Sequence, residues 1–365
     1  MRRAGDAAFG LLVLVSLLSL LLPFAVVVST SLKAPGELLQ RAQDGEMPSL
    51  LPRSLFIDTI ALRVRGPSST ARAAQRTLRD RLEALRAETR VDHWSAVIGE
   101  TGEGEVSVSY DRRLVGPADV QRLVTDAGLS FTQPEPPRPW PVLTSYVRVF
   151  TQNPFHLYLL NSAVVATLTT LLCLLVGGTC AYALARLRFP MRDAVLSLLL
   201  AVSMFPPIAV VSPLFLILKK AHLLNTHAAL VIPYTAFGLP LTVWTLTGFF
   251  RDLPLELEEA ARVDGCSRLR TFVEIFLPLA GPGVFTCAIL VFIFAWNEFL
   301  FALLFVTRDA MRTVTVGITM YPGQFDTPWG TIFAAATIVT LPLIGVVFAL
   351  QRRIIEGLTA GAVKG

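Results

Sequence analysis

The chain has 365 residues, of which 53% are hydrophobic and only 16% are charged, with a formal net charge of +5. A mean hydropathy of +0.59 excludes an ordinary soluble globule and is typical of a protein with several membrane-spanning helices. We interpret the arginines in the short segments between apolar runs as topology signals, and we expect no nucleic-acid binding from the positive net charge.

Six apolar segments are long enough to cross a bilayer, because a spanning helix needs about 20 mostly apolar residues. We predict spans at residues 8–31, 158–185, 193–218, 228–250, 280–306 and 329–350. Arginines before the first span, in alternate loops and after the last span place both termini in the cytoplasm, although Lys219 and Lys220 oppose this orientation. The first apolar run exceeds the core of a signal peptide, so we expect it to be retained.

The segment between the first two spans is not membrane-like, and its middle is predicted to be a folded α+β domain. Period-two alternation predicts strands, and apolar stripes predict amphipathic helices. The predicted elements are a strand at 54–65, a helix at 68–90, strands at 91–98 and 105–110, a helix at 117–128 and a strand at 129–132. This order is the split βαβ pattern of ferredoxin-like domains.

Two roles stay open for this domain: it is either a docking or sensing module or a structural addition. A proline-rich stretch at 133–141 should form a stiff connector to the next span. The four cysteines lie outside the domain, so it should have no disulfide framework, and their spacing is not that of metal ligands. They are Cys173, Cys180, Cys266 and Cys287.

The charged segment 251–278, between the fourth and fifth spans, has the pattern of two short helices. Glu258 and Glu259 lie in the first turns of the first helix, where the helix dipole favours carboxylates. Ala260 and Ala261 have small side chains, so another protein can approach this face of the helix closely. Gly265 should break the helix, because glycine adopts backbone angles that other residues avoid. The segment therefore predicts a docking surface for a cytoplasmic partner.

The second helix of this segment carries apolar residues at helical spacing, with arginines left for solvent or partner acids. Its apolar positions are Leu269, Phe272, Ile275 and Phe276. Leu277-Pro278 is expected to end it.

The order Glu-Ala-Ala, Gly265 and Ile275-x-Leu277-Pro278 resembles the EAA loop of ABC importer permeases. Other strings resemble the type-1 permease core, and within it the sugar-importing branch that includes the maltose permeases. They are Asn161-Ser162, AYALARLRFP at 181–190, MFPP at 204–207, FAWNEFLFALL at 294–304 and GLTAGAVKG at 357–365. The resemblance leaves out the inserted domain.

The resemblance implies an all-α polytopic fold of six transmembrane helices, and the topology read from the arginines places the inserted α+β domain outside the cytoplasm. The chain is then divided into 1–40 with the first helix, 41–140 with the inserted domain and linker, and 141–365 with the permease core. The core contains the coupling loop, residues 251–278, and a C-terminal tail, residues 351–365. The expected location is the cytoplasmic membrane of a prokaryote.

The resemblance also implies a permease subunit that imports maltose, maltodextrin or a related oligosaccharide by alternating access. Its expected partners are a second permease subunit in a heterodimer, two copies of an ABC ATPase and an external sugar-binding protein. No cofactor is expected on this chain, since ATP and magnesium would be held by the ATPase. In the maltose system the partner permease mainly holds the sugar, so no sugar site is predicted here.

Three groups of site residues are predicted. The loop residues expected to contact the ATPase are Glu258, Glu259, Ala260, Ala261, Asp264, Gly265, Ile275, Leu277 and Pro278. The tail residues expected to contact it are Gly357, Leu358, Thr359, Gly361 and Lys364. Candidates for the translocation path are Tyr234, Trp296, Asn297 and Glu298. Polar residues within a span face a cavity or a partner helix, so Asn297 and Glu298 are either path residues or contacts between helices.

The sequence contains no GxxxxGK[ST] phosphate loop, no HExxH and no GxSxG motif. The energy for transport is therefore expected from a separate ATPase, and the chain is not predicted to be an enzyme. Two alternatives stay open: the same architecture with a cargo such as a polyamine or phosphate, and a membrane receptor that signals through the coupling loop.

Overall fold

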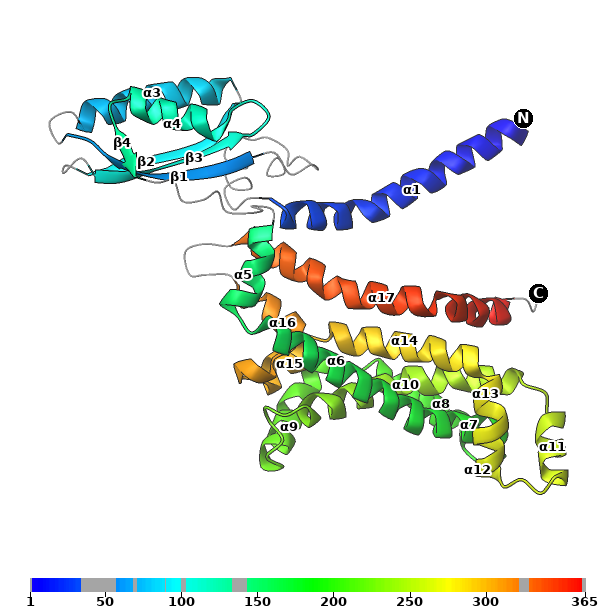
Figure 1. Ribbon diagram of the computed structural model, residues 1–365. Coiled ribbons are helices and arrows are strands. Elements are labelled where there is room, and N and C mark those ends of the chain that lie inside the picture. The colour runs from blue at the N-terminus through cyan, green and yellow to red at the C-terminus, as the bar shows by residue number, and fades with distance from the viewer. Residues whose placement is uncertain are drawn as a thin grey trace. The chain divides into compact units, whose positions relative to one another are not determined.

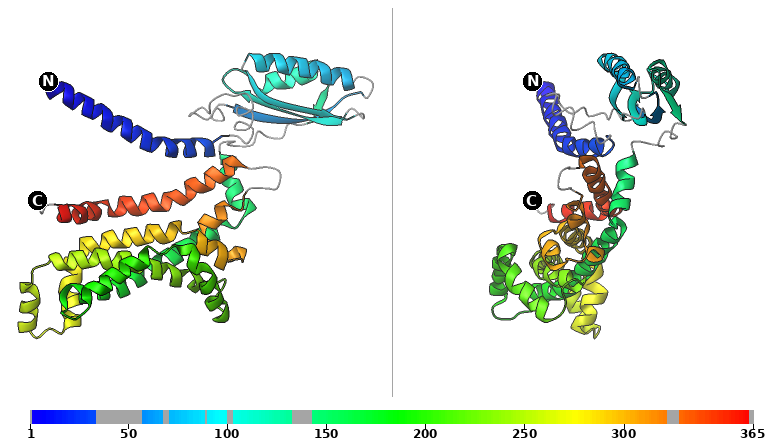
Figure 2. Two further views of the ribbon diagram at one scale, coloured as in Figure 1. Left: turned by 180° about the vertical axis from the view of Figure 1, so that it is seen from behind. Right: turned by 90° about the vertical axis from the view of Figure 1, so that its left-hand side faces the viewer.

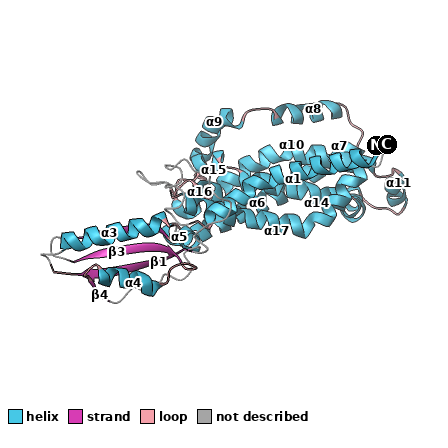
Figure 3. Ribbon diagram, turned by 90° about the horizontal axis from the view of Figure 1, so that it is seen from above, coloured by secondary structure: helices cyan, strands magenta, loops and turns pink. Residues whose placement is uncertain are grey.

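The computed structural model describes residues 2–33, 57–67, 71–88, 90–99, 103–132, 143–321 and 328–362. The chain forms two compact units, one of Met1–Thr151 with Pro322–Thr337 and the other of Gln152–Tyr321 with Ile338–Gly365. Helices predominate, and all strands shown belong to one domain of the first unit (Figure 3).

The α+β domain has the predicted order of elements. Its strands are β1 (Ile57–Arg65), β2 (Val91–Ile98), β3 (Glu103–Asp111) and β4 (Ser130–Thr132), and its helices are α3 (Ala71–Ala87) and α4 (Pro117–Asp126). The sheet order is β2-β3-β1-β4, and all neighbours are antiparallel. This is the ferredoxin-like order, and both helices cover one face of the sheet (Figures 1 and 2).

Alternating burial explains why the sequence pattern identified this domain. Leu62 and Val64 on β1 are buried against Leu78 of α3 and Val120 of α4. Helix α4 begins at Pro117, and the Asp119 carboxylate accepts a 2.9 Å hydrogen bond from the Gly116 backbone N–H. Local capping and the apolar period therefore agree with the packing.

The first unit also contains apolar helices. Helix α1 (Arg2–Ser31) includes a candidate span at Val13–Ser31. It contacts α5 (Thr144–Gln152) through the hydroxyls of Ser31 and Tyr146, 2.7 Å apart. The first part of α17 (Trp329–Ala362) belongs to the same unit.

The second unit is a helical bundle in which α10 packs against α6, α7, α8 and α14. Its elements are α6 (Phe155–Leu172), the π-helical η3 (Cys173–Gly177), α7 (Gly178–Arg186), α8 (Arg192–Ser203), α9 (Pro207–Lys220), α10 (Ala228–Asp252), α11 (Glu256–Val263), α12 (Arg268–Thr271), the π-helical η4 (Phe272–Phe276), α13 (Leu277–Leu279), α14 (Gly281–Asn297), α15 (Leu300–Phe305), the 3₁₀ turn η5 (Asp309–Met311), α16 (Val314–Ile318) and the rest of α17.

Among the described residues, four helices are long and apolar enough to cross a membrane, and two bent pairs raise the number to six. The predicted third span is one bent pair: α8 and α9 meet at 93°, with the break at Met204–Pro206. Prolines 206 and 207 account for the break, because proline cannot donate the helical hydrogen bond. Pro233 and Pro240 do not end α10, which continues through both.

The predicted fifth span, 280–306, is wrong as a single helix. Helix α14 ends at Asn297, Glu298 is extended, and a new short helix, α15, comes after it. The Glu298 carboxylate accepts hydrogen bonds from the backbone N–H groups of Phe301 (3.0 Å) and Ala302 (3.3 Å). These N–H groups lack partners within α15, so Glu298 stabilises the separate helix.

Candidate functional site

Helix α11 opens the coupling loop and ends in a Schellman motif. Glu256, Glu258 and Glu259 lie in its first turn, as the helix dipole favours. At its end, Cys266 N–H donates to the Ala261 carbonyl (2.9 Å) and Gly265 N–H to the Arg262 carbonyl (3.0 Å). Gly265 has φ +76°, the left-handed conformation that this motif requires. The predicted helix break at Gly265 is confirmed.

The predicted contact residues of α11 divide between two faces. Glu259, Ala260 and Asp264 are exposed, and Val263 beside them is 87% exposed. Glu258 and Ala261 are instead buried within this chain. Only the first group can meet a partner without rearrangement, so Ala261 does not form the low outer face that the sequence suggested.

The second helix of the loop begins at Ser267, whose hydroxyl accepts a 3.3 Å hydrogen bond from Arg270 N–H. It runs through α12, η4 and α13 to Leu279, past the predicted end at Pro278. Phe272 and Phe276 are buried, whereas Leu269 is exposed. Ile275 and Leu277 are half-buried, and Pro278 is exposed.

An aromatic cluster anchors this second helix to the bundle. Tyr182 of α7 lies 5.1 Å from the Phe272 ring and 5.3 Å from the Phe276 ring, centroid to centroid. Phe250, near the end of α10, lies 6.2 Å from Tyr182 in an edge-on arrangement. We name these four residues the ring cluster. No sequence pattern distinguishes Tyr182 or Phe250 from other aromatic residues of a membrane span, so neither was predicted as a site residue.

The candidate path residues lie near one another but differ in exposure. Tyr234 and Trp296 are buried, and Tyr234 is within electrostatic range of Glu298. Asn297 is exposed and donates to the Ile293 carbonyl of its own helix (2.9 Å). The Glu298 carboxylate holds α15, and its backbone carbonyl accepts a 2.7 Å hydrogen bond from the Thr315 hydroxyl. These contacts give Glu298 a structural task within this chain.

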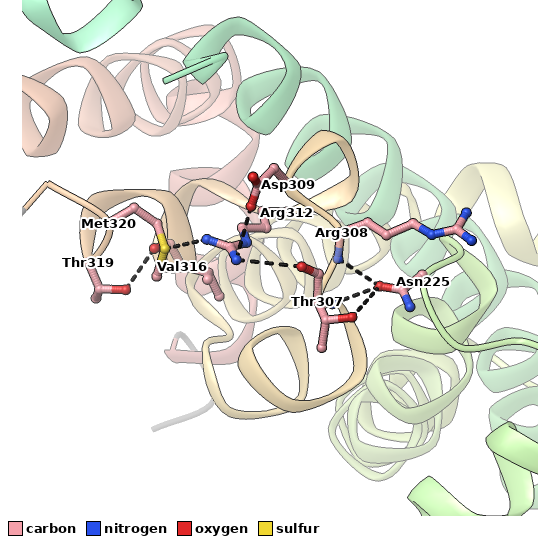
Figure 4. Close-up of polar contacts among 8 residues, drawn as sticks. All are labelled: Asn225, Thr307, Arg308, Asp309, Arg312, Val316, Thr319 and Met320. Carbon is pink, nitrogen blue, oxygen red and sulfur yellow. Dashed lines mark hydrogen bonds and ion pairs between the residues drawn. The ribbon is translucent and has the colours of Figure 1, made fainter. Parts of the chain in front are cut away.

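The opposite end of the bundle from α11 and α12 contains α9, α15 and α16 (Figure 1). There Asn225, with φ +60°, accepts hydrogen bonds at its Oδ1 from Thr307 N–H (2.7 Å) and Arg308 N–H (2.9 Å). Arg312 forms a 3.0 Å ion pair with Asp309 and also contacts Met320 (Figure 4). The loop after α9 is thus joined to the segment before α16.

Asn161 extends these contacts into α6. Its Nδ2 donates to the carbonyls of Ala310 (2.9 Å) and Arg312 (3.0 Å), and its Oδ1 lies 3.0 Å from His227 Nε2. The neighbouring Ser162 hydroxyl accepts a 3.0 Å hydrogen bond from Val314 N–H. We call this set, with Asn225 and Arg312, the polar network. It explains why Asn161-Ser162 stands out in an otherwise apolar helix.

The predicted tail residues Gly357, Leu358, Thr359 and Gly361 lie in the last turns of α17, where side chains are not described. Lys364 lies outside the described residues. In the described part of the chain, no group of three or more His, Cys, Asp or Glu residues could hold a metal ion.

Comparison with known proteins gives concordant matches. The family model described as "Binding-protein-dependent transport system inner membrane component" matches residues 174–359. The chain is 44% identical over 225 residues to the sulfoquinovosyl glycerol transport system permease protein SmoH of Agrobacterium fabrum, covering 62% of this chain and 79% of that protein. It is 45% identical over 226 residues to the trehalose/maltose transport system permease protein MalG of Thermococcus litoralis, covering 61% and 81%.

A third relative is the trehalose transport system permease protein SugB of Mycobacterium tuberculosis, 43% identical over 223 residues, which are 60% of this chain and 81% of that protein. Among solved structures, a bacterial ABC transporter involved in the import of the acidic polysaccharide alginate matches with a TM-score of 0.58. The match covers 96% of both chains at 16% identity, so it shows a shared fold.

Proposed function

The chain belongs to the family of inner membrane components of binding-protein-dependent transport systems, and from this premise we propose that it is the permease subunit of an ATP-driven oligosaccharide importer. The names of the relatives, which are permeases of transport systems for trehalose, trehalose/maltose and sulfoquinovosyl glycerol, support a carbohydrate as cargo. Maltose, maltodextrin or a related oligosaccharide fits this group best.

The coupling loop is the observation that carries the proposal. Helix α11 has one face buried in the bundle and another that exposes Glu259, Ala260 and Val263. A separate ABC ATPase, holding ATP and magnesium, docks on that exposed face. Glu259 then supplies a polar contact, while Gly265 shapes the turn that presents the helix.

The proposed assembly contains this chain, a second permease subunit, two ATPase copies and an external sugar-binding protein. Both termini and the coupling loop lie in the cytoplasm, and the α+β domain lies outside. Closure of the two ATPases draws the coupling helices together and turns an inward-facing cavity outward. The binding protein delivers the sugar to that cavity, and hydrolysis resets the transporter.

Gly265 and Gly281 provide a matched test. A Cβ would meet open space at both glycines, but only Gly265 has a positive φ. Gly265→Ala should therefore distort the end of α11 and strongly reduce uptake of labelled maltose or trehalose, while the protein still inserts. Gly281→Ala should leave uptake close to wild type. Normal uptake by Gly265→Ala would refute the coupling role, and uptake of only a non-carbohydrate solute by the wild type would refute the cargo.

A further inference from the structure

A single arginine lies where α7, the end of α10 and the coupling loop meet. Arg186 is the last residue of α7, and its Nη2 donates to the backbone carbonyls of Phe250 (2.5 Å) and Leu253. The last carbonyls of a helix have no partner within it, and basic side chains can satisfy them. Arg186 therefore caps α10 at the point from which the coupling loop departs.

The same guanidinium also contacts the returning half of the loop. Its Cζ lies 4.7 Å from the centroid of the Phe276 ring, within the range of a cation–π interaction. Phe276 is fully buried in the ring cluster. One side chain thus contacts both the start of the loop and the helix that returns from it.

Glu258 is the third element of this arrangement. Its side chain is only 6% exposed, and its ion-pair partner Arg262, one turn later on α11, is 61% exposed. A buried carboxylate is costly unless it is well neutralised. Arg186 is within electrostatic range of Glu258, and its buried Nε has no hydrogen-bond partner among the described residues. The guanidinium can therefore serve the carboxylate as a second positive charge from within the bundle.

We propose that Arg186 is a positioning residue that holds both halves of the coupling loop against α7 and supplies a second charge to Glu258. Displacement of α11 is then transmitted through the Arg186 guanidinium to α7, which is continuous with α6 through η3. This last step rests on the proposed transport function, whereas the holding of the loop does not.

The holding role is tested on the full chain in lipid nanodiscs by hydrogen exchange of residues 254–279. Arg186→Gln should speed exchange there about tenfold or more, the change expected when a charge-assisted hydrogen bond is lost. Arg188→Gln is the matched control, because Arg188 is an exposed arginine two residues beyond the end of α7, and it should exchange as wild type. Wild-type exchange in Arg186→Gln would overturn the proposal.

The conservative variant separates positioning from general packing. Arg186→Lys can still donate to a carbonyl but has no planar face for Phe276, so its exchange should lie between wild type and Arg186→Gln. Should Arg186→Gln fail to accumulate in the membrane, Arg186→Lys decides alone: exchange of 254–279 faster than wild type supports the proposal, and wild-type exchange overturns it. Adding Glu258→Gln to Arg186→Gln should raise exchange by less than the product of the two single effects, as coupled residues require. If exchange in the double variant rose by the full product of the two single effects, Arg186 and Glu258 would not act as charge partners.

Transmission is tested with the assembled transporter. Arg186→Gln should retain the ATPase on co-purification, yet the ratio of ATP hydrolysis with and without sugar-loaded binding protein should fall towards 1. An unchanged ratio would overturn transmission through Arg186. Failure of the wild-type chain to retain any ATPase would refute the proposed function itself, and the hydrogen-exchange result would still decide the holding role.

Discussion

Both ends of the helical bundle have ring contacts, such as Phe215 with Phe305 at the end with α9, but they differ in how many hydrogen bonds join distant segments. At the end with α9, α15 and α16, the polar network joins segments far apart in sequence through hydrogen bonds to backbone groups, as between Asn161 and the Ala310 carbonyl. At the end with α11 and α12, the packed rings of the ring cluster provide most of the contacts, and Arg186 adds hydrogen bonds to the Phe250 and Leu253 carbonyls. Hydrogen bonds demand defined distances and angles, whereas apolar ring contacts are less directional.

This difference suggests that the two ends respond differently to displacement. A hydrogen-bonded end keeps one geometry or breaks, while packed rings can shift by a fraction of an ångström and stay in contact. We therefore expect the polar network to behave as a rigid reference, whereas the coupling end moves as a unit that Arg186 holds together. Four substitutions test this comparison.

The largest effect is expected at Asn161. Asn161→Leu removes its two bonds to backbone carbonyls and its contact with His227, and should destabilise the fold by about 3 kcal/mol at roughly 1 kcal/mol per contact. Thermal unfolding in detergent and hydrogen exchange of 306–320 measure this. Asn297→Leu is the control, since Asn297 is exposed and bonds only within its own helix. Equal losses in both variants would remove the case for a rigid polar end.

The next effect concerns the close approach of α16 to α6. A Cβ on Gly317 would lie 2.4 Å from Cδ2 of the buried Tyr158 ring. Gly317→Ala should therefore cost about 1–3 kcal/mol through overpacking. Gly248→Ala, where a Cβ meets nothing within 4 Å, should instead stabilise α10 by about 0.5–1 kcal/mol. Thermal unfolding of both variants measures the two changes in stability. If Gly317→Ala left stability unchanged, this end of the bundle would be able to relax around the added methyl group.

A smaller, local effect is expected at the coupling end. Ser267→Ala removes the N-cap of α12 and should cost about 1 kcal/mol. Exchange should rise in 268–276 and stay unchanged in 306–320, because the two ends are held separately. Ser197→Ala is a suitable control, since Ser197 bonds back to the Asp193 carbonyl inside a helix. Faster exchange at 306–320 in Ser267→Ala would contradict the separation.

The smallest effect is expected at Tyr182. Its buried hydroxyl has no hydrogen-bond partner among the described residues, so Tyr182→Phe keeps the ring contacts and should change stability by less than about 0.5 kcal/mol. Tyr146→Phe loses the 2.7 Å contact with Ser31 and should cost about 1 kcal/mol. The difference between the two melting temperatures is the measurement. A larger loss at Tyr182 would show that its hydroxyl, and not only its ring, holds the coupling end.

The parts of the fold that the sequence predicted are those specified by local rules. In the α+β domain, Leu62 and Val64 alternate with exposed neighbours, and Pro117 and Gly128 mark the ends of one helical segment. In the coupling loop, Gly265 alone identifies the end of α11. Capping, turn chemistry and apolar period act over a few residues, so a single sequence displays them.

The parts that the sequence did not predict depend on contacts between distant residues. The apolar run 299–305 reads as a continuation of α14, yet Glu298 separates the two helices and Thr315 holds its carbonyl. Arg186 is one of the arginines between the second and third predicted spans, which indicate only topology in the sequence, because its contacts with Phe250 and Leu253 are 64 and 67 residues away along the chain. The division of α11 into a buried and an exposed face also required the three-dimensional packing.

The two π-helical turns, η3 and η4, determine the registry of the helical residues beyond them. A π turn accommodates one residue more than an α-helical turn, so removing a residue from it restores regular hydrogen bonding. All side chains beyond the deletion would then rotate by about 100° around the helix axis. Shortening η4 by one residue would turn Phe276 away from Arg186, and alignments with permeases that lack this turn should show a one-residue gap at 272–276.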